Sequence, residues 1–188
     1  MISRHVSVVF LVAMLVAVAA AGTAAVWSKE AEAATVTVET CAGGTIDLTA
    51  AEKRILDLHN KAREKRGRQA LCVHPALTAA ARFHSQEMLD KDYLSHNSYN
   101  GETVRERLER FGYAFAGYSY WTYGENYAVG WGTSSTPDNC FKYWMNSSGH
   151  RANILNREFR EVGIGVRLGT FKTHQGTTMC TVDFGTRR

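Results

Sequence analysis

The spacing of apolar residues predicts four helices in the middle of the chain. Two of them begin at a capping box, in which a threonine and the glutamate three positions later satisfy each other's backbone N–H groups. Apolar side chains then recur three or four positions apart, and a glycine in a left-handed conformation can end a helix. The predicted helices run from Thr49 to Gly67, from Pro75 to Met88, from Thr103 to Gly112 and from Cys140 to Asn146.

Beyond residue 160 the pattern changes from helical spacing to alternation. Val162, Ile164 and Val166 alternate with glycines, which let another backbone pack closely, and residues 177–184 alternate enough to form a last strand. We predict a hairpin turn between these strands at His174-Gln175-Gly176. Helices followed by late strands place the chain in the α+β class.

Aromatic residues interleaved with glycines fill residues 113–132 and predict an irregular loop that packs by its rings. Burial of these rings as part of the core is the interpretation we favour, and exposed rings that stack on sugar or lipid are the alternative. Glu125 lies among them. A carboxylate in such surroundings needs a cation, a hydrogen-bond donor or a metal-bound water, since burial otherwise neutralises it.

The first 33 residues have the features of a secretory signal, namely an early positive charge, an apolar run and the small-x-small site Ala31-Glu32-Ala33. An uncleaved membrane anchor is the alternative. Residues 34–47 are short, polar and glycine-containing, and predict a flexible lead. Residues 48–188 then form one domain, which we expect outside the cell or at its envelope.

The formal net charge is +4, and acidic and basic residues are interspersed along the chain. This pattern does not support nucleic-acid binding, while attraction to an anionic wall or membrane surface remains open. Contact with a membrane is otherwise expected only through residues 1–33. The sequence does not indicate an oligomeric state.

Four cysteines, Cys41, Cys72, Cys140 and Cys180, remain after the signal segment. An even number in an exported chain predicts two disulfides, and no two of these cysteines have zinc-ligand spacing. Three pairings are possible. We favour Cys140 with Cys180, which joins a helix to the last strand, and Cys41 with Cys72.

Four histidines raise the question of chemistry. We expect Gly149 to end a helix and to place His150 just past it, and His96 to lie in a polar turn. His59 on a helix stripe is better explained as a hydrogen-bonded packing residue than as a ligand. His84-Ser85 is not a nucleophile pair, because adjacent helical residues point in different directions.

Four ordered motifs between about Leu48 and Gly185 resemble the CAP superfamily (cysteine-rich secretory proteins, antigen 5 and pathogenesis-related 1) in its bacterial SCP-like form. They are His-Asn-x-x-Arg at residues 59–63, Tyr-x-Ser-His at 93–96, Gly-Glu-Asn-x-Ala at 124–128, and a segment with Gly-His and Gly-Ile-Gly at 144–166. The resemblance implies an α/β/α sandwich with a small, mainly antiparallel sheet between helical layers.

CAP proteins line a central cleft with two histidines and two glutamates, and the histidines can hold a divalent metal. The resemblance assigns the histidines to His96 and His150 and one glutamate to Glu125. The second glutamate follows the helix tryptophan by three positions, where this chain has Ser147. Any zinc binding should therefore be weak and should fade below about pH 6.5, where imidazoles become protonated.

These observations lead to three functional hypotheses. The first is a secreted binding module whose partner is a lipid or a cell-wall glycan. The second is a metal-assisted hydrolase of peptides or wall material, in which Glu125 acts as general base beside zinc on His96 and His150. The third is a structural domain with a buried polar network. We favour binding without turnover, since a catalytic zinc has three protein ligands and this chain offers two imidazoles.

Overall fold

A four-stranded sheet lies at the centre of the protein and consists of β3 (Cys72–Val73), β4 (Trp121–Gly130), β5 (Glu161–Phe171) and β6 (His174–Arg187). The computed structural model describes residues 34–188, and the strand order is β3-β5-β6-β4. β6 pairs antiparallel with β4 and β5, while the short β3 pairs parallel with β5. The mainly antiparallel sheet agrees with the predicted fold class.

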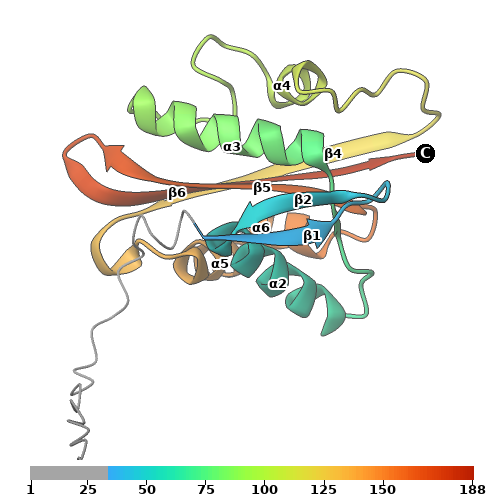
Figure 1. Ribbon diagram of the computed structural model, residues 1–188, viewed down its shortest axis with the longest axis horizontal. Coiled ribbons are helices and arrows are strands. Elements are labelled where there is room, and N and C mark those ends of the chain that lie inside the picture. The colour runs from blue at the N-terminus through green and yellow to red at the C-terminus, as the bar shows by residue number, and fades with distance from the viewer. Residues whose placement is uncertain (1–33) are drawn as a thin grey trace, which may run out of the picture.

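Helices cover both faces of this sheet and give the predicted α/β/α layering (Figure 1). α3 (Pro75–Asp90) and α4 (Val104–Arg110) lie on one face. α2 (Ala50–Glu64), α5 (Pro137–Asn146) and α6 (Ser148–Leu155) lie on the other, and the short 3-10 helix η1 (Gly132–Ser134) precedes α5. Both predicted capping boxes form, at the start of α2 and at the start of α4.

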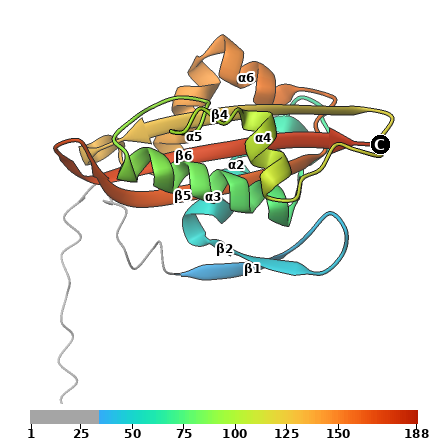
Figure 2. The ribbon, with the colours of Figure 1, turned by 90° about the horizontal axis from the view of Figure 1, so that it is seen from above.

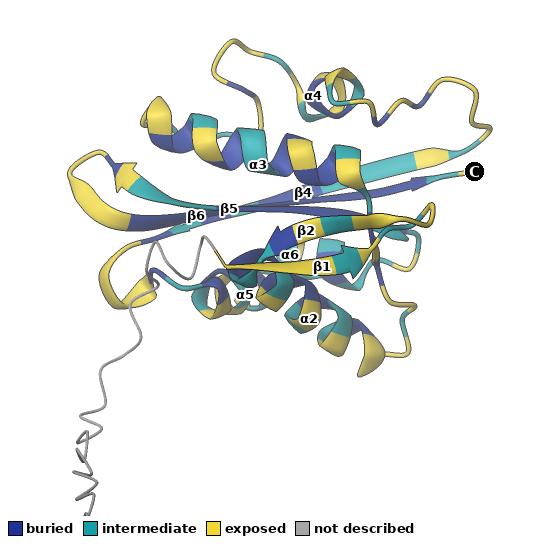
Figure 3. Cartoon of the chain, viewed as in Figure 1, coloured by how far each residue is buried: buried dark blue, intermediate teal, exposed yellow. Residues whose placement is uncertain are grey.

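Close contact between α3 and β5 explains the alternating glycines of the Gly-Ile-Gly segment. A Cβ atom on Gly163 would lie 2.0 Å from the carbonyl carbon of Leu77, and one on Gly165 would lie 2.3 Å from that of Ala81. Only glycine permits this approach. The sheet is accordingly buried along most of its length, as the dark strands in Figure 3 show.

The segment predicted as a flexible lead, residues 34–47, is ordered instead. β1 (Thr35–Glu39) and β2 (Thr45–Thr49) form an antiparallel hairpin that lies beside the main sheet (Figure 2). Gly43 and Gly44 have positive φ angles and make the turn possible. The predicted signal segment, residues 1–33, lies outside the described residues.

The aromatic segment is half loop and half strand, which corrects the prediction of an irregular loop over residues 113–132. Residues 121–130 form β4 and pair with β6 along their whole length. The rings divide between two environments. Tyr113 and Phe115 are buried, whereas Tyr118, Trp121 and Trp131 are exposed.

Two predicted turns lie elsewhere. Gly149 does not end a helix in a left-handed conformation, because α5 ends at Asn146 and Gly149 lies inside α6. The hairpin between β5 and β6 turns at residues 172–173 rather than at residues 174–176, which belong to β6. A register shift near Gly169 accommodates the last pair of this hairpin.

Both disulfides have the pairing that we favoured. Cys41 bonds Cys72, with Cα atoms 5.2 Å apart, and ties the N-terminal hairpin to β3. Cys140 bonds Cys180, with Cα atoms 6.6 Å apart, and joins α5 to β6. Within residues 34–188 none of the helices has both the length and the apolar character needed to cross a membrane.

Candidate functional site: a buried glutamate between an arginine and a histidine

Glu125 lies in the middle of β4, and its side chain is only 1% exposed. Arg107 donates a hydrogen bond to Oε2, and the Nδ1 atom of His96 lies 2.7 Å from Oε1. Because an ionised carboxylate only accepts, Nδ1 of His96 carries a proton and donates to Glu125. The sequence argument that Glu125 must find a positive partner is therefore satisfied by protein groups.

The electrostatics of Glu125 follow from these contacts. Burial alone would raise the pKa of Glu125, but the hydrogen bond from His96 and the charges of Arg107 and His84 hold that pKa below its ordinary value. The carboxylate is therefore ionised at neutral pH. The negative charge of Glu125 is balanced by the positive charge of Arg107, whose side chain is fully buried.

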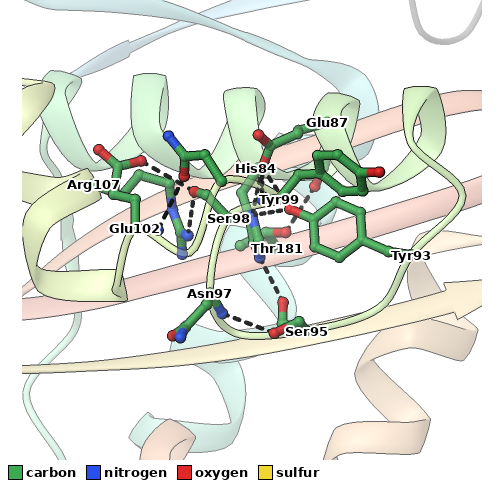
Figure 4. Close-up of polar contacts among 12 residues, drawn as sticks. His84, Glu87, Tyr93, Ser95, Asn97, Ser98, Tyr99, Glu102, Arg107 and Thr181 are labelled. Carbon is green, nitrogen blue, oxygen red and sulfur yellow. Dashed lines mark hydrogen bonds and ion pairs between the residues drawn. The ribbon is translucent and has the colours of Figure 1, made fainter.

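The loop that carries His96 is fixed at several points (Figure 4). Nε2 of His84 donates to the carbonyl of Ser95 at 2.8 Å. Arg107 donates to the carbonyl of His96 and to the hydroxyl of Ser98, both at 3.1 Å. The side chain of His96 is 52% exposed, so a rigid backbone presents an accessible imidazole.

His150 lies in the first turn of α6 and is held through the asparagine of the Gly-Glu-Asn motif. Asn126 donates from Nδ2 to the carbonyl of His150 at 3.0 Å, and Asn153 donates to the Oδ1 atom of Asn126 at 2.9 Å. Burial, and then the charge of His96, lower the pKa of His150 below its ordinary value. The buried Nδ1 atom of His150 has no hydrogen-bond partner among the described residues.

Asp183 lies opposite Glu125 in the β4–β6 register and is fully buried. Within residues 34–188 neither of its carboxyl oxygens has a hydrogen-bond partner. Burial, and next the charge of Glu125, raise the pKa of Asp183 well above its usual range and favour its neutral form. The site thus contains one ionised and one neutral carboxyl group side by side.

The remaining predicted site residue, Ser147, lies between α5 and α6 as the residue that ends one helix and precedes the other. Its hydroxyl makes no capping hydrogen bond to α6. Within residues 34–188, no three His, Cys, Asp or Glu side chains converge as a set that could hold a metal ion. The two imidazoles that the sequence analysis named as cation ligands differ in access, because the side chain of His96 is 52% exposed whereas the Nδ1 atom of His150 is buried.

Sequence reasoning missed Arg107 and Asp183. We assigned Arg107 to a solvated, mixed-charge face of its helix, yet it is buried and pairs with Glu125. Its position gave a signal, because it follows Val104 by three residues and therefore shares the apolar stripe of α4. Asp183 lies in the last strand, where the sequence pattern gives no comparable signal that it faces Glu125.

The histidine of the His-Asn-x-x-Arg motif, His59, is not part of this site. His59 is fully buried in α2, and its Nδ1 atom lies 2.8 Å from the carbonyl of Ile55. This agrees with the interpretation of a packing residue. His84 and Ser85 also form no pair, since the hydroxyl of Ser85 donates to the carbonyl of Gly165 and also lies 2.9 Å from the hydroxyl of Thr181.

Comparisons with known sequences show related proteins in bacteria. The protein YkwD of Bacillus subtilis (strain 168) is 40% identical over 129 residues, which are 68% of this chain and 47% of YkwD. The membrane protein YlbC of the same organism is 33% identical over 118 residues, 63% of this chain and 32% of YlbC. The chain thus spans less than half the length of these relatives.

Solved structures share the fold. An extracellular protein from Bacillus anthracis that contains an SCP domain has a TM-score of 0.59 at 25% identity, and the match covers 76% of this chain and 46% of that one. An outer surface protein of Borrelia burgdorferi has a TM-score of 0.60 at 18% identity, and the match covers 82% of this chain and 99% of that one.

A family model gives the assignment. The model described as CAP, the cysteine-rich secretory protein family, matches residues 56–184. This range includes the loop with His96, the strand with Glu125 and the helix with His150, and it takes up more than half of the chain. The protein therefore belongs to the CAP family of cysteine-rich secretory proteins.

Proposed function

We propose that this CAP-domain protein is a binding module that acts outside the cell or at its envelope, and that its His96/His150 cleft takes a divalent cation, such as zinc, with weak affinity. The observation that carries the proposal is the engagement of Glu125 by Arg107 and His96. Two disulfides, which persist in oxidising compartments, support an extracellular location. So does the likeness to an extracellular SCP protein of Bacillus anthracis.

The alternative of a metal-assisted hydrolase has less support from this geometry. A general base must be able to reach the proton it removes, and Glu125 is almost entirely buried with both oxygens bonded. Its lowered pKa also makes it a weaker base. The two imidazoles are one donor short of the three protein ligands that a catalytic zinc usually has.

The same geometry suits a weak cation site. A carboxylate that accepts a hydrogen bond from one nitrogen of a histidine fixes the tautomer and directs the other nitrogen outward, an arrangement common behind metal-binding histidines. Glu125 has this relation to His96. A bound divalent cation would supply a positive centre for an oxygen of the module's ligand.

The partly exposed rings beside the site suit a glycan as that ligand. Trp121, Tyr123 and Tyr127 alternate along β4 with the same period as Glu125, so they share its face of the strand. Trp121 and Tyr123 stack with centroids 6.1 Å apart, and the Tyr127 ring lies 4.9 Å from that of His96. Flat rings next to a polar cleft provide stacking surfaces for sugars, which supports a cell-wall glycan over a lipid.

The test is a zinc titration by calorimetry at pH 7.5 and at pH 5.5, with His150→Ala and, as a matched control, His174→Ala. His174 is exposed and stacks on Trp131, with ring centroids 4.2 Å apart. We expect saturable binding that weakens at the lower pH, because the imidazoles become protonated, and that is lost only in His150→Ala.

Two other outcomes would contradict the proposal. Binding that does not depend on His150 would remove the cleft as a cation site. Hydrolysis of peptide or wall material that is lost both on chelation and in Glu125→Gln would establish the hydrolase instead. If His96 or His150 variants lose stability but bind an added glycan as well as the unchanged protein does, the polar network is only structural.

A further inference from the structure

The His-Asn-x-x-Arg motif organises a second surface, which is lined by residues other than those of the cleft. Arg63 is fully buried and donates hydrogen bonds to four backbone carbonyls, those of Gln69, Ile154, Asn156 and Phe159, at 2.8 to 3.0 Å. Asn60 bonds the backbone of Leu71 in both directions. The motif therefore holds the segment after α2 against the segment after α6, in the lower layer of Figure 1.

This clamp brings three further arginines around one hollow. Arg68, Arg157 and Arg160, together with Gly67 and Gln69, line a depression of about 320 Å³. Nε of Arg68 bonds the carbonyl of Leu155, and Arg160 bonds that of Phe159, so both guanidinium groups are held in place by backbone. The side chain of Arg157 is exposed and makes no hydrogen bond within the described residues.

None of the described residues that line the hollow is acidic, and none of its three arginines forms an ion pair among the described residues. Glu158 pairs with Arg188. Glu64 and Asp57 line a neighbouring hollow that Arg68 also borders, so acidic side chains lie on one side of the arginine hollow. Burial, followed by the charges of Arg160 and Arg68, lowers the pKa of Arg63 to about 10, as expected for a cluster of like charges.

More cations continue from the hollow along the surface. An adjoining groove of about 500 Å³ between α2 and α5 has four of them at its edge, Lys61, Lys65, Arg66 and Lys142. None of these four forms an ion pair within residues 34–188 either. The seven side chains make a basic band across the end of α2, although the charges looked interspersed along the sequence.

We infer that this basic band binds the phosphate groups of a polyanionic chain, with Arg68, Arg157 and Arg160 as its phosphate-binding pocket. Guanidinium forks match the geometry of phosphate oxygens, and fixed forks lose little freedom on binding. The cations beyond the hollow would follow the neighbouring charges of the same chain. The band lies outside the cleft, so this site is separate from the proposed cation site.

A polymer suits the three-arginine hollow better than a membrane surface does. The arginines line a concave depression, which admits a phosphate group carried on a thin chain. Peripheral membrane binding usually adds apolar or aromatic side chains that enter the lipid interface. No apolar side chain lines this hollow, and Leu58, Phe141, Met145 and Leu155 line only the groove between α2 and α5.

The test measures binding of a short linear polyphosphate by calorimetry at several salt concentrations. Arg68→Gln with Arg157→Gln and Arg160→Gln should weaken binding more than about tenfold. Arg157→Gln alone, which removes no structural bond, should weaken it about threefold and reduce the salt dependence by about one ion. A control that removes the same charge elsewhere, Lys91→Gln with Lys172→Gln and Arg105→Gln, should bind within about twofold of the unchanged protein. Inorganic phosphate should compete with the polyphosphate.

Further variants and ligands test whether the arginines recognise phosphate or only provide net charge. Replacing the three arginines with lysine keeps the charge and loses the fork, so polyphosphate binding should recover only in part. Equal losses in the control triple, or equally tight binding of poly-aspartate, would overturn the phosphate pocket in favour of net charge alone. Binding to phosphatidylglycerol vesicles without binding to polyphosphate would overturn it in favour of a membrane. His150→Ala should leave polyphosphate binding unchanged, which separates this inference from the cleft.

Discussion

Two fully buried arginines, one on each face of the sheet, are satisfied in different ways. Arg63 in α2 donates only to neutral backbone carbonyls. Arg107 in α4 donates to the carboxylate of Glu125 as well as to Ser98 and the carbonyl of His96. The first arginine keeps its charge without a counter-ion and holds loops together, whereas the second neutralises a carboxylate and fixes a site. The two variants below should therefore fail for different reasons.

The largest effect is expected from Arg107→Met. It leaves the carboxylate of Glu125 buried beside His96 with its main cation gone, and breaking a buried ion pair in this way costs about 3–5 kcal/mol of unfolding free energy. Urea unfolding followed by tryptophan fluorescence measures the loss. Adding Glu125→Gln to the same chain should restore part of it, because the orphaned charge is removed. A loss below about 1 kcal/mol would mean that the pair is not desolvated.

Arg63→Met should cost slightly less, about 2–4 kcal/mol, since it leaves four carbonyls without donors but strands no charge. The same unfolding measurement applies. No single change of an acidic residue should rescue this variant, in contrast to Arg107→Met. Rescue by an acid-to-amide substitution would show that Arg63 has a carboxylate partner after all.

The pH dependence of stability separates the faces further. Burial lowers the pKa of His59 to about 4, an effect that its hydrogen bond to Ile55 opposes and the charge of Arg63 reinforces. The unfolded histidine takes up a proton near pH 6.5 and the folded one does not, so stability is full above pH 6.5 and falls as the pH drops toward 4. The unfolding free energy lost through His59 between pH 6.5 and pH 4 is at most about 3 kcal/mol.

Unfolding free energies at pH 7, 6, 5 and 4 test this contribution of His59. The variant His59→Gln should have a shallower slope than the unchanged protein between pH 6.5 and pH 4, whatever its stability at pH 7. Identical slopes would mean that His59 titrates normally in the folded state. The lowered pKa of Glu125 makes a separate contribution that is lost at lower pH, as the pH falls through its folded-state pKa.

The smallest effects are expected when the N-terminal caps of α2 and α4, the helices that carry Arg63 and Arg107, are removed. Thr49→Ala and Thr103→Ala should each cost about 1 kcal/mol, because each removes a side-chain cap. Only Thr103→Ala should also speed amide hydrogen exchange at residues 95–98, since the seven-residue α4 positions Arg107 against that loop. Faster exchange there in Thr49→Ala would show that the two faces are coupled.

Much of the fold could be predicted because strong local signals agreed with it. Capping boxes, apolar stripes and alternating glycines identified the helices and the last strands, and the ordered motifs indicated the layering. The N-terminal hairpin could also have been found, since Val36 and Val38 alternate with threonines and face Leu48 and Ile46 across it. Its shortness and polar composition outweighed that signal.

The candidate site was predictable in its residue types and less so in its partners. Motifs pointed to His96, Glu125 and His150, but pairing across the fold depends on tertiary contacts that no local pattern contains. Asp183 faces Glu125 only because β4 and β6 pair in one particular register. Gly149 was misjudged because α5 already ends at Asn146 and α6 begins at Ser148, before the glycine can end the earlier helix.

The position of β6 at the centre of the sheet determines when the molecule can assemble during its synthesis. β6 leaves the ribosome after β4 and β5, yet both of these strands pair with it. Until residues 174–187 arrive, β4 has no partner strand among the described residues, and Cys180 cannot yet meet Cys140. The chain therefore remains an incomplete fold, and its core closes only after β6 has been synthesised.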